Sequence, residues 1–515
     1  LRSAQDQTDT TIKAQSQKIA DFSIAQSNKI QFFEIRISQI KEDAQQLLLH
    51  APELSEFKHF LERIFIMQSH ILSEPEERIL NLKGQTSFSK WVRMTSSLIS
   101  KETRVLKVDG KASELSFEEL LKISSLHHDE NTRDAATAHL NDIMDKLADV
   151  AENEINAILQ DKKINDELRG YTRPDQARHL ADDIDTTVVD AMLTAVTSRN
   201  DLAHKFYTLK AKMLGKTKLK YNERNLEIGE IKGTYNWDES VNLVHKVFHD
   251  LDPQFSTIFD AMLKNGQFDI FPRKGKKGGA FCAGNLISHP TYVLLNHTDK
   301  LNDVLTLAHE MGHAINNESM KLSQNALNYD TPLSTAEVSS TFMEDFVLQD
   351  LEKSADTQTK KALLMQKLND DISTIFRQVA CYKFEQSLHT TFREKGYLSK
   401  NEIGELFQKN MSAYMGNAVE QPNWAQNWWI YWSHIRSFFY VYSYASGLLI
   451  SKAMQNMVKQ NSAEIKKVKT FLSAGTSDSP KNIFAKMDID ITNAEFWNLG
   501  LNEIEKSLQE AEMLI

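Results

Sequence analysis

With 515 residues, of which 41% are hydrophobic and 25% charged, the chain has the composition of a globular protein and is long enough for more than one domain. Its formal net charge of −10 argues against general affinity for nucleic acid or for an anionic membrane surface. Few glycines and only 9 prolines favour a mainly helical architecture.

The cysteine count and the N-terminal sequence bear on the compartment. Two cysteines, Cys282 and Cys381, lie far apart in the sequence, and such sparse usage favours a reducing environment. Residues 1–30 are polar and charged and lack the apolar core of a signal peptide. The most apolar stretch, 438–450, is too short to span a bilayer. We therefore expect a cytoplasmic protein, although the chain starts at leucine and a targeting segment ahead of it stays open.

Helical periodicity runs through the first part of the chain. Apolar residues recur at three- and four-residue spacing over 18–50, 54–72, 140–159 and 185–196. Ser116 followed by Glu119 has the signature of a capping box and predicts a further helix start. We expect a helical N-terminal region over 1–190 and a catalytic region over 191–515, with the boundary near 180–200.

The middle of the chain carries the strand signals. Two short strand candidates, flanked by glycine or proline, are 280–283 and 292–296. A helix is predicted before them over 239–264 and another after them over 299–316. From there to the C-terminus the pattern predicts long helices.

The most informative feature is the H-E-x-x-H motif at 309–313, which lies inside the apolar-periodic run 301–315. Residues four apart share one face of a helix, so His309 and His313 can bind the same metal ion. Glu310 lies one position round the helix, where it can reach a water on that metal without acting as a ligand. Buried histidines need polar partners, and a metal ion satisfies both at once. The motif therefore predicts a metal site rather than two incidental surface histidines.

A third protein ligand must come from outside the motif. The metzincin class would need glycine at 316 and histidine at 319, but the chain has Asn316 and Ser319, which excludes that class. Carboxylates on the next predicted helix are the remaining source. Glu337 and Glu344 lie two turns apart on one face, so one can bind the metal while the other hydrogen-bonds a ligating histidine. Spacing alone does not say which.

Several segments together resemble a known family. The glycine-rich sequence 278–284, the strand candidate 292–296 and the motif region 301–314 are similar to oligopeptidase F, a bacterial branch of the thimet oligopeptidase family of zinc metallopeptidases. Further similar segments, which carry the resemblance from about residue 70 onward, are 71–77, 169–171, 337–341 and 434–444.

The resemblance implies a metal centre with defined roles. One Zn²⁺ per chain would be bound by His309, His313 and Glu337, with Glu344 as the hydrogen-bond partner of a ligand. Glu310 would be the general base that takes a proton from a zinc-activated water and later passes it to the leaving amine.

Donors for the oxyanion are expected in the segment 434–444. In the resembling family a histidine and tyrosines of this region contact the scissile carbonyl, which makes His434, Tyr444 and Tyr440 the candidates. On a regular helix Tyr440 and Tyr444 share a face, while Tyr442 points elsewhere. Each tyrosine could instead pack in a core, and core packing is also the default for the tryptophan cluster that precedes His434.

The strand candidates come directly before the motif helix, so an exposed strand edge beside the zinc could pair with an extended peptide. We expect Phe281, Tyr292 and Val293 to bind substrate there, with a purely structural hairpin as the alternative. By resemblance the fold is a two-part helical ellipsoid with a deep central channel and a small β-sheet next to the zinc-binding helix.

Such a channel admits short unfolded peptides, so the chain is expected to be a zinc metalloendopeptidase of the oligopeptidase type. A related zinc carboxypeptidase and an inactive helical peptide-binding protein are the alternatives. The sequence leaves the oligomeric state and the physiological peptides open.

Overall fold

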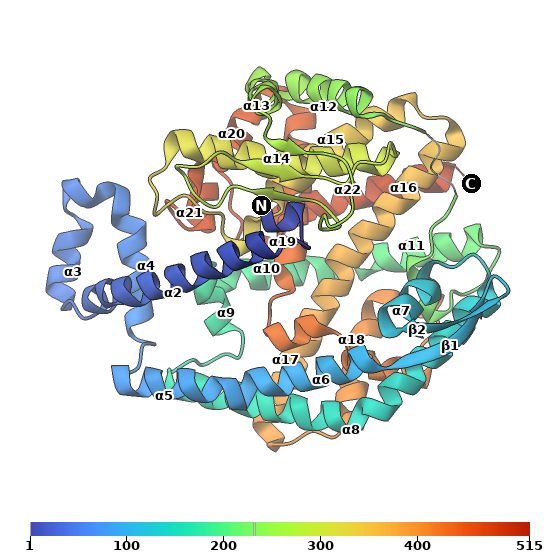
Figure 1. Ribbon diagram of the computed structural model, residues 1–515, viewed down its shortest axis with the longest axis horizontal. Coiled ribbons are helices and arrows are strands. Elements are labelled where there is room, and N and C mark those ends of the chain that lie inside the picture. The colour runs from blue at the N-terminus through green and yellow to red at the C-terminus, as the bar shows by residue number, and fades with distance from the viewer. Residues whose placement is uncertain (1, 230, 232, 515) are drawn as a thin grey trace.

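Long helices form the N-terminal part of the computed structural model, which describes residues 2–229, 231 and 233–514. The longest of them, α8, has 39 residues and runs along the lower edge of the molecule in Figure 1. The helices of this part are α1 (Arg2–Gln5), α2 (Thr10–Ser38), α3 (Glu42–Leu49), α4 (Lys58–Gln68), α5 (Glu74–Gly84), α6 (Lys90–Lys101), α7 (Phe117–Leu126), α8 (Glu130–Leu168), α9 (Gln176–Ala181), α10 (Thr186–Ser198) and α11 (Asn200–Met213).

Two features of this part differ from the sequence prediction. The stretch 18–50 forms two helices, α2 and α3, and an antiparallel hairpin of β1 (Thr103–Val108) and β2 (Lys111–Ser116) interrupts the helical series. Asp109 and Gly110 make its two-residue turn, with φ values of 49° and 85°. Asp-Gly is a strong hairpin signal, so the sequence did hold this information. The helix start predicted from Ser116 is confirmed by the capping box of α7.

The second part of the chain contributes the helices that surround the motif. The predicted helix over 239–264 is two helices, because Pro253 has no N–H with which to continue the first one. The helices of this part are α12 (Trp237–Leu251), α13 (Pro253–Lys264), α14 (Leu301–Ser323), α15 (Val338–Ser354), α16 (Thr357–Asp371), α17 (Arg377–Lys395), α18 (Lys400–Met415), α19 (Tyr442–Gln460), α20 (Ile465–Ala474), α21 (Pro480–Ala485) and α22 (Ala494–Met513).

A three-stranded sheet packs directly against α14, the helix that carries the motif. Its order is β3-β5-β4, with β3 (Phe268–Asp269) parallel and β4 (Phe281–Ala283) antiparallel to the central strand β5 (Tyr292–Leu294). The two predicted strands are thus confirmed as β4 and β5, while β3, with two residues, lay below what periodicity can detect. The order leaves β4 at the edge of the sheet.

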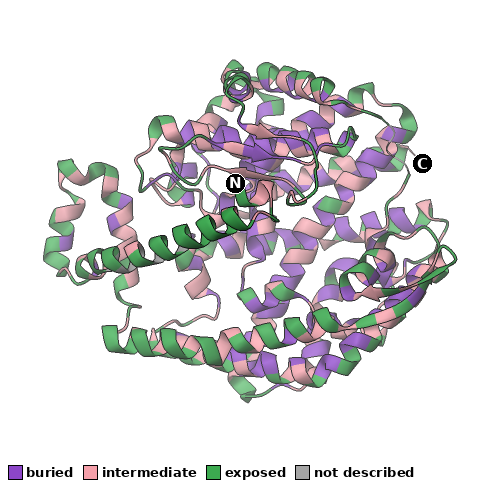
Figure 2. Cartoon of the chain, in the orientation of Figure 1, coloured by how far each residue is buried: buried purple, intermediate pink, exposed green. Residues whose placement is uncertain are grey.

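Buried apolar residues run through both parts of the chain. The core extends from Leu106 on β1 to Ala511 on α22, and the predicted division near residue 190 stays a prediction. Figure 2 shows buried residues concentrated in the helices around α14, while α2 is largely exposed.

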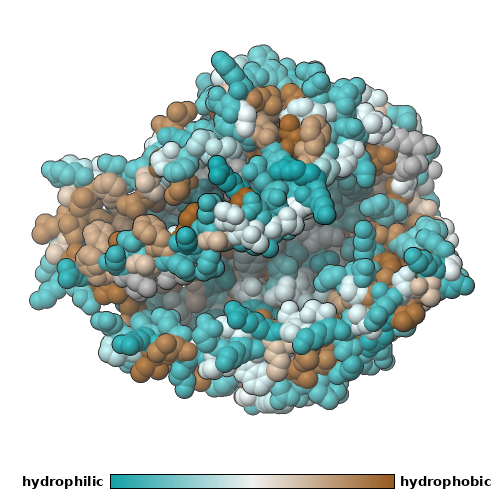
Figure 3. Space-filling view, in the orientation of Figure 1, coloured by the Kyte–Doolittle hydropathy of each residue, from teal (hydrophilic) through white to brown (hydrophobic). Residues whose placement is uncertain are grey.

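Figure 3 shows a hollow across the face of the molecule, between the α12–α14 side and the rim formed by α5, α6 and α8. The predicted mainly helical, two-part architecture with a central channel and a small sheet beside α14 is confirmed. None of the described helices is both long and apolar enough to cross a membrane.

Candidate metal centre

Helix α14 places the two motif histidines on one face. The ring centroids of His309 and His313 lie 5.2 Å apart, and most of the helix around them is buried. Gly312, between the histidines, allows α15 to pack closely, because a Cβ atom there would lie 2.5 Å from the carbonyl oxygen of Ser339. Any side chain at this position would push α15 and its carboxylates away from the histidines.

Glu337 lies between the two histidines, at the N-terminal end of α15. Its Oε2 atom is 3.4 Å from Nε2 of His309 and 3.4 Å from Nε2 of His313. The ligand atoms of the three residues lie within 4.8 Å of one another. Glu337 follows the short 3-10 turn η4 (Leu333–Thr335) and occupies the N-cap position of α15, so its side chain projects from the helix end toward α14. Three metal-binding atoms from two elements therefore converge on one point.

Glu344 supports His309 from the other side of its ring. The Nδ1 atom of His309 donates to Oε2 of Glu344 at 2.8 Å. An ionised carboxylate only accepts, so Nδ1 carries a proton, and Nε2 is the ring nitrogen that faces Glu337 and would bind a metal after losing its proton. The geometry thus groups Glu337 with the two imidazole nitrogens and places Glu344 behind His309.

The electrostatics of these groups suit a divalent cation. Burial opposes ionisation of Glu337, yet its contacts with His309 and His313 hold its pKa well below the usual range. Burial also disfavours a charged His309, but the carboxylates of Glu337 and Glu344 outweigh it and raise the pKa of His309 to about 10. The centre therefore carries negative charge that attracts a cation. Two imidazoles and one carboxylate are a ligand set typical of catalytic zinc.

Glu310 lies between the histidines and the edge strand β4. It is 7% exposed, and burial raises its pKa. The N–H of Val293 donates to the carbonyl oxygen of Gln267, on the β3 side of the central strand. Cys282 is the partner of Val293 on β4, and the two residues form no backbone hydrogen bond with each other. The backbone groups of Cys282 therefore point to the outer edge of β4. There the backbone N–H of Cys282 lies near the carboxylate of Glu310 and favours its ionised form, against the effect of burial. Burial, with the charge of Glu310, raises the pKa of the Cys282 thiol to about 12.

A second group of polar side chains precedes α19. The indole Nε1 of Trp432 donates to Nδ1 of His434 at 3.1 Å. Because an indole N–H only donates, Nδ1 carries no proton, and Nε2 of the neutral ring donates to the hydroxyl of Tyr444 at 3.0 Å. Burial and the charge of Arg377 lower the pKa of His434, which keeps the ring neutral. Trp432, for which core packing was the default expectation and the wall of a substrate channel the alternative, thus fixes the tautomer that makes Nε2 a donor.

Helix α19 connects this second group to the metal-binding residues. Gly447, one turn after Tyr444, lies against Glu337, because a Cβ atom at Gly447 would be 3.3 Å from Cβ of Glu337. Burial and the neighbouring Tyr440 raise the pKa of Tyr444 to about 12, so its phenol stays protonated. The rings of Tyr440 and Tyr444 lie 5.6 Å apart. The hydroxyl donors therefore gather on the side of Glu337.

A regular helix over 434–444, on which Tyr440 and Tyr444 would share a face, does not form. His434 lies in a 3-10 turn, η8 (Ser433–Ser437), and α19 begins only at Tyr442. Between them Phe438 and Phe439 have φ values of 35° and 58°. Tyr440 lies between this turn and the start of α19, where its carbonyl oxygen accepts the N–H of Ser443 at 3.2 Å.

Two side chains from other parts of the chain hold this turn. Glu385, fully buried on α17, accepts the N–H of Phe439 at 2.8 Å. Arg178 on α9 donates to the carbonyl oxygens of Ser437 and Phe438 at 2.9 and 3.2 Å. Left-handed conformations of residues other than glycine cost about 1–3 kcal/mol each, so they persist only where surrounding contacts determine them.

Comparison with known proteins places this arrangement in a family. The sequence model of Peptidase family M3 matches residues 57–503. The chain belongs to peptidase family M3. The resemblance read from the sequence is thus confirmed, and the family's metallopeptidase chemistry agrees with the group on α14 and α15.

Relatives of this M3 peptidase cover nearly the whole chain. It is 25% identical to Group B oligopeptidase PepB of Streptococcus agalactiae over 495 residues, which are 95% of this chain and 82% of that protein. Oligopeptidase PepF of Bacillus subtilis is 23% identical over 527 residues, covering 100% of this chain and 78% of the relative. A crystal structure from Chlamydophila abortus superposes with a TM-score of 0.93 at 23% identity and covers 100% of this chain and 87% of that one. The structure of oligoendopeptidase-F from Enterococcus faecium gives a TM-score of 0.75 at 20% identity, with coverage of 100% and 88%.

The three predicted substrate contacts of this M3 peptidase have different surroundings. Phe281 on the edge strand β4 is partly exposed, with Nζ of Lys277 lying 5.4 Å from its ring centroid, and Tyr292 is partly exposed as well. Val293 is fully buried in the central strand, and its N–H is already bonded to Gln267. Val293 therefore lies in the sheet interior, away from the edge where a peptide would bind.

A second group of potential ligands in this M3 peptidase consists of Asp109, His127 and His128. The Nδ1 atom of His127 accepts the backbone N–H of Asp129 at 3.1 Å. The proton of the neutral ring is therefore on Nε2, which lies 3.5 Å from Oδ1 of Asp109. A nitrogen that keeps its proton does not bind a metal, and the backbone N–H at Nδ1 holds the proton of His127 on Nε2.

Proposed function

We propose that this M3 peptidase is a zinc-dependent endopeptidase that hydrolyses short unstructured peptides in the cytoplasm. The observation that carries the proposal is the convergence of His309, His313 and Glu337 on one point, with the buried carboxylate of Glu310 beside them. The names of its relatives, oligopeptidase PepB and oligopeptidase PepF, point to the same class of substrate.

The ligand set would hold one zinc ion per chain. His309 and His313 supply imidazole nitrogens and Glu337 supplies a carboxylate oxygen, while Glu344 fixes the ring of His309 through its Nδ1–H. A zinc ion bound there supplies Lewis acidity, which lowers the pKa of water and polarises the scissile carbonyl.

Glu310 and the donors before α19 would perform the proton transfer and stabilise charge. Glu310 takes the proton from the attacking water and passes it to the nitrogen of the leaving amine. The carbonyl oxygen becomes an oxyanion in the tetrahedral intermediate and needs hydrogen-bond donors. The Nε2–H of neutral His434 and the protonated hydroxyl of Tyr444 are such donors, and Tyr440 lies next to them.

The strand edge and the hollow would select the substrate. The outer edge of β4 offers backbone groups that can pair with an extended peptide, with Phe281 beside them. The hollow seen in Figure 3 would give an extended chain access to the site, and we expect it to exclude folded proteins. A zinc carboxypeptidase and an inactive peptide-binding protein are less well supported, since the relatives carry oligopeptidase names and Glu310 is present.

One experiment tests the function directly. A quenched decapeptide is incubated with the full chain before and after chelation, and again after zinc is returned; products are identified by mass spectrometry and bound metal is counted. We expect internal cuts, one zinc per chain, and activity that follows zinc. A ladder of successive C-terminal losses would instead indicate a carboxypeptidase, and one bound zinc without any cleavage would indicate a binding protein.

A further inference from the structure

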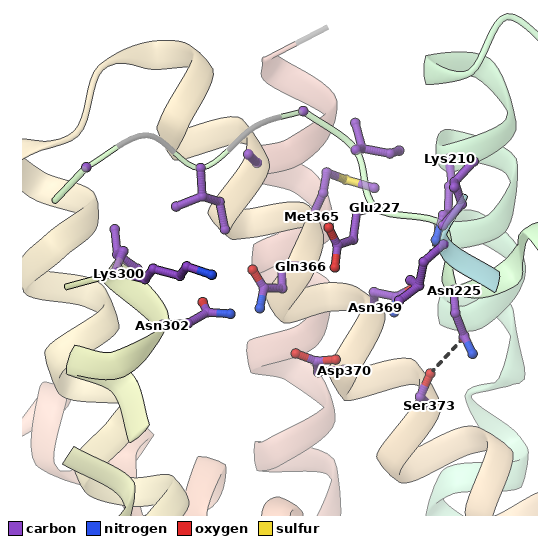
Figure 4. Close-up of a pocket in the computed structure, with 18 of the residues that line it drawn as sticks. Lys210, Asn225, Glu227, Lys300, Asn302, Met365, Gln366, Asn369, Asp370 and Ser373 are labelled. Atoms are coloured by element: carbon purple, nitrogen blue, oxygen red, sulfur yellow. Dashed lines mark hydrogen bonds between the residues drawn. The ribbon is translucent and has the colours of Figure 1, made fainter. Parts of the chain in front are cut away.

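A large cavity lies between the start of α14, helix α16 and the segment that follows α11. Its volume is about 690 Å³. Figure 4 shows polar side chains from different elements directed into the same space. Those that matter here are Glu227, Lys300, Asn302, Gln366, Asn369 and Asp370.

The cavity lies along the face of α14 that carries the metal-binding histidines. Asn302 precedes His309 by seven residues, which is two helical turns, so both side chains project from the same face. Seven residues of helix span about 10 Å, and an extended peptide covers that distance in about three residues. A peptide with its scissile bond at His309 therefore places a residue about three positions away at this cavity.

Asp370 is the distinctive group of the cavity. No described residue forms a hydrogen bond or an ion pair with its carboxylate, which is reached by solvent through the cavity. Desolvation by the cavity walls, together with the negative charges of Asp371, Glu344 and Glu227, raises the pKa of Asp370 to about 7, although the side chain is exposed to solvent in the cavity. A positive charge placed beside Asp370 would relieve this repulsion and stabilise the ionised carboxylate.

The cations around the cavity are engaged elsewhere or lie on another wall. Lys210 donates to the carbonyl oxygen of Arg224 at 2.6 Å and to Oδ1 of Asn369 at 2.8 Å. The guanidinium of Arg377 lies 4.9 Å from the ring centroid of Trp432. Lys300 enters from the side of α14, across the cavity from Glu227 (Figure 4).

We propose that this cavity is a subsite for a positively charged group of the peptide substrate, a lysine or arginine side chain two to four residues from the cleaved bond, and that Asp370 binds it. The side-chain amides of Gln366 and Asn302 offer further oxygen acceptors for an ammonium or guanidinium group. The assignment rests on the proposed peptidase function and adds a preference for basic peptides to it.

The test compares lysine with its neutral analogue at each position of a peptide. Quenched nonapeptides carry a single lysine, or a single Nε-acetyl-lysine, moved stepwise along a serine and alanine background. For the wild type we expect kcat/KM to be about tenfold higher with lysine at one or two positions, two to four residues from the cut. In Asp370→Asn the lysine-to-acetyl-lysine ratio should fall to about one. The ratio cancels any general loss of turnover in this variant.

A control and a binding measurement separate the possible failures. Asp350→Asn removes a carboxylate that pairs with Lys246 on the outside of α15, and it should keep the tenfold ratio. Calorimetry with Glu310→Gln protein measures the affinity for the same peptides without turnover. A ratio near one at every position in the wild type, or an unchanged ratio in Asp370→Asn, overturns the subsite. If no peptide is cleaved, the peptidase proposal fails. The ratio of the affinities for the lysine and acetyl-lysine peptides still shows whether the cavity binds a positively charged side chain.

Discussion

The two halves of the candidate active site are built in different ways. His309, Glu310 and His313 lie on α14, a regular helix whose periodicity alone puts them on one face. His434 and Tyr444 are joined by a 3-10 turn and two residues with positive φ. The first half is determined within one helix and its contact with α15, whereas the second depends on side chains of α9 and α17.

Because of this difference, substitutions in the two halves of the site should reduce activity in different ways. A substitution of His309, Glu310 or His313 removes a chemical group and leaves α14 in place, so its effect is confined to the reaction. A substitution around the turn at Phe438 and Phe439 can displace several donors together, because the backbone there is held by distant contacts. The predictions below separate these two behaviours.

The largest effect is expected at Glu310. Glu310→Gln removes the proton acceptor but keeps the size of the side chain, so kcat/KM should fall by about a thousandfold, within the range of general-base removal. Bound zinc, measured by metal analysis, should stay at one per chain. Glu318→Gln is the matched control on the same helix, because Glu318 contacts Lys321 and Thr291 rather than the histidines. Equal rates for Glu310→Gln and this control would remove the assigned role.

The next effect is expected at Tyr444. Tyr444→Phe deletes one hydroxyl donor to the oxyanion, so kcat should fall by about a hundredfold with little change in zinc content. Tyr442→Phe deletes a hydroxyl that bonds to Asp182 at 2.9 Å, away from the ligands, and serves as the comparison. Steady-state kinetics of both variants test the assignment, and an equal drop in kcat would contradict it.

A smaller effect is expected from the residue that holds the turn. Glu385→Leu removes the acceptor of the Phe439 N–H, and the released turn should lower kcat by about tenfold through misplaced donors. Glu385→Gln keeps an oxygen acceptor and should stay within about twofold of the wild type. If both variants behave alike, the hydrogen bond does not control the turn.

The smallest effect concerns stability against pH. Burial raises the pKa of Glu385 to about 8 from its usual value of 4.5. Between these values the folded state binds more protons than the unfolded state, so this group makes stability fall as pH rises toward 8. Glu385→Gln has no titrating group at this position, so its stability lacks this pH-dependent contribution. The unfolding free energy of Glu385→Gln relative to the wild type should therefore increase by at least about 1.4 kcal/mol from pH 5 to pH 8. Denaturant titrations at both pH values check this, and a constant difference would argue against the buried, protonated carboxyl.

The parts that could be predicted from the sequence are those with local causes. The helix α14 follows from its apolar spacing, and β4 and β5 follow from short apolar runs between glycine and proline. The hairpin β1–β2 was missed although Asp109 and Gly110 carried a turn signal. Spacing left Glu337 and Glu344 equivalent; the resemblance favoured Glu337 as the ligand, and the positions of the two carboxylates around His309 agree with it.

The remaining parts have causes that lie far away in the sequence. The turn at Phe438 and Phe439 depends on Glu385, about fifty residues earlier, and on Arg178, which is 260 residues from Phe438. No window of sequence around the turn contains this information. The cavity beside Asp370 could not be predicted from a local window of sequence either, because its walls come from α14, α16 and the segment after α11.

The environment of Cys282 has a practical consequence for spectroscopy. Thiol reagents attack the thiolate, and its fraction at neutral pH is negligible for Cys282, whose pKa is about 12. Cys381 is fully buried, which raises its thiol pKa well above the usual value. The two native cysteines should therefore react slowly with thiol reagents, and they need not be removed before a cysteine is introduced for labelling. A single cysteine introduced on α5 or α6, at the rim of the hollow, can carry a fluorophore that reports when a peptide enters.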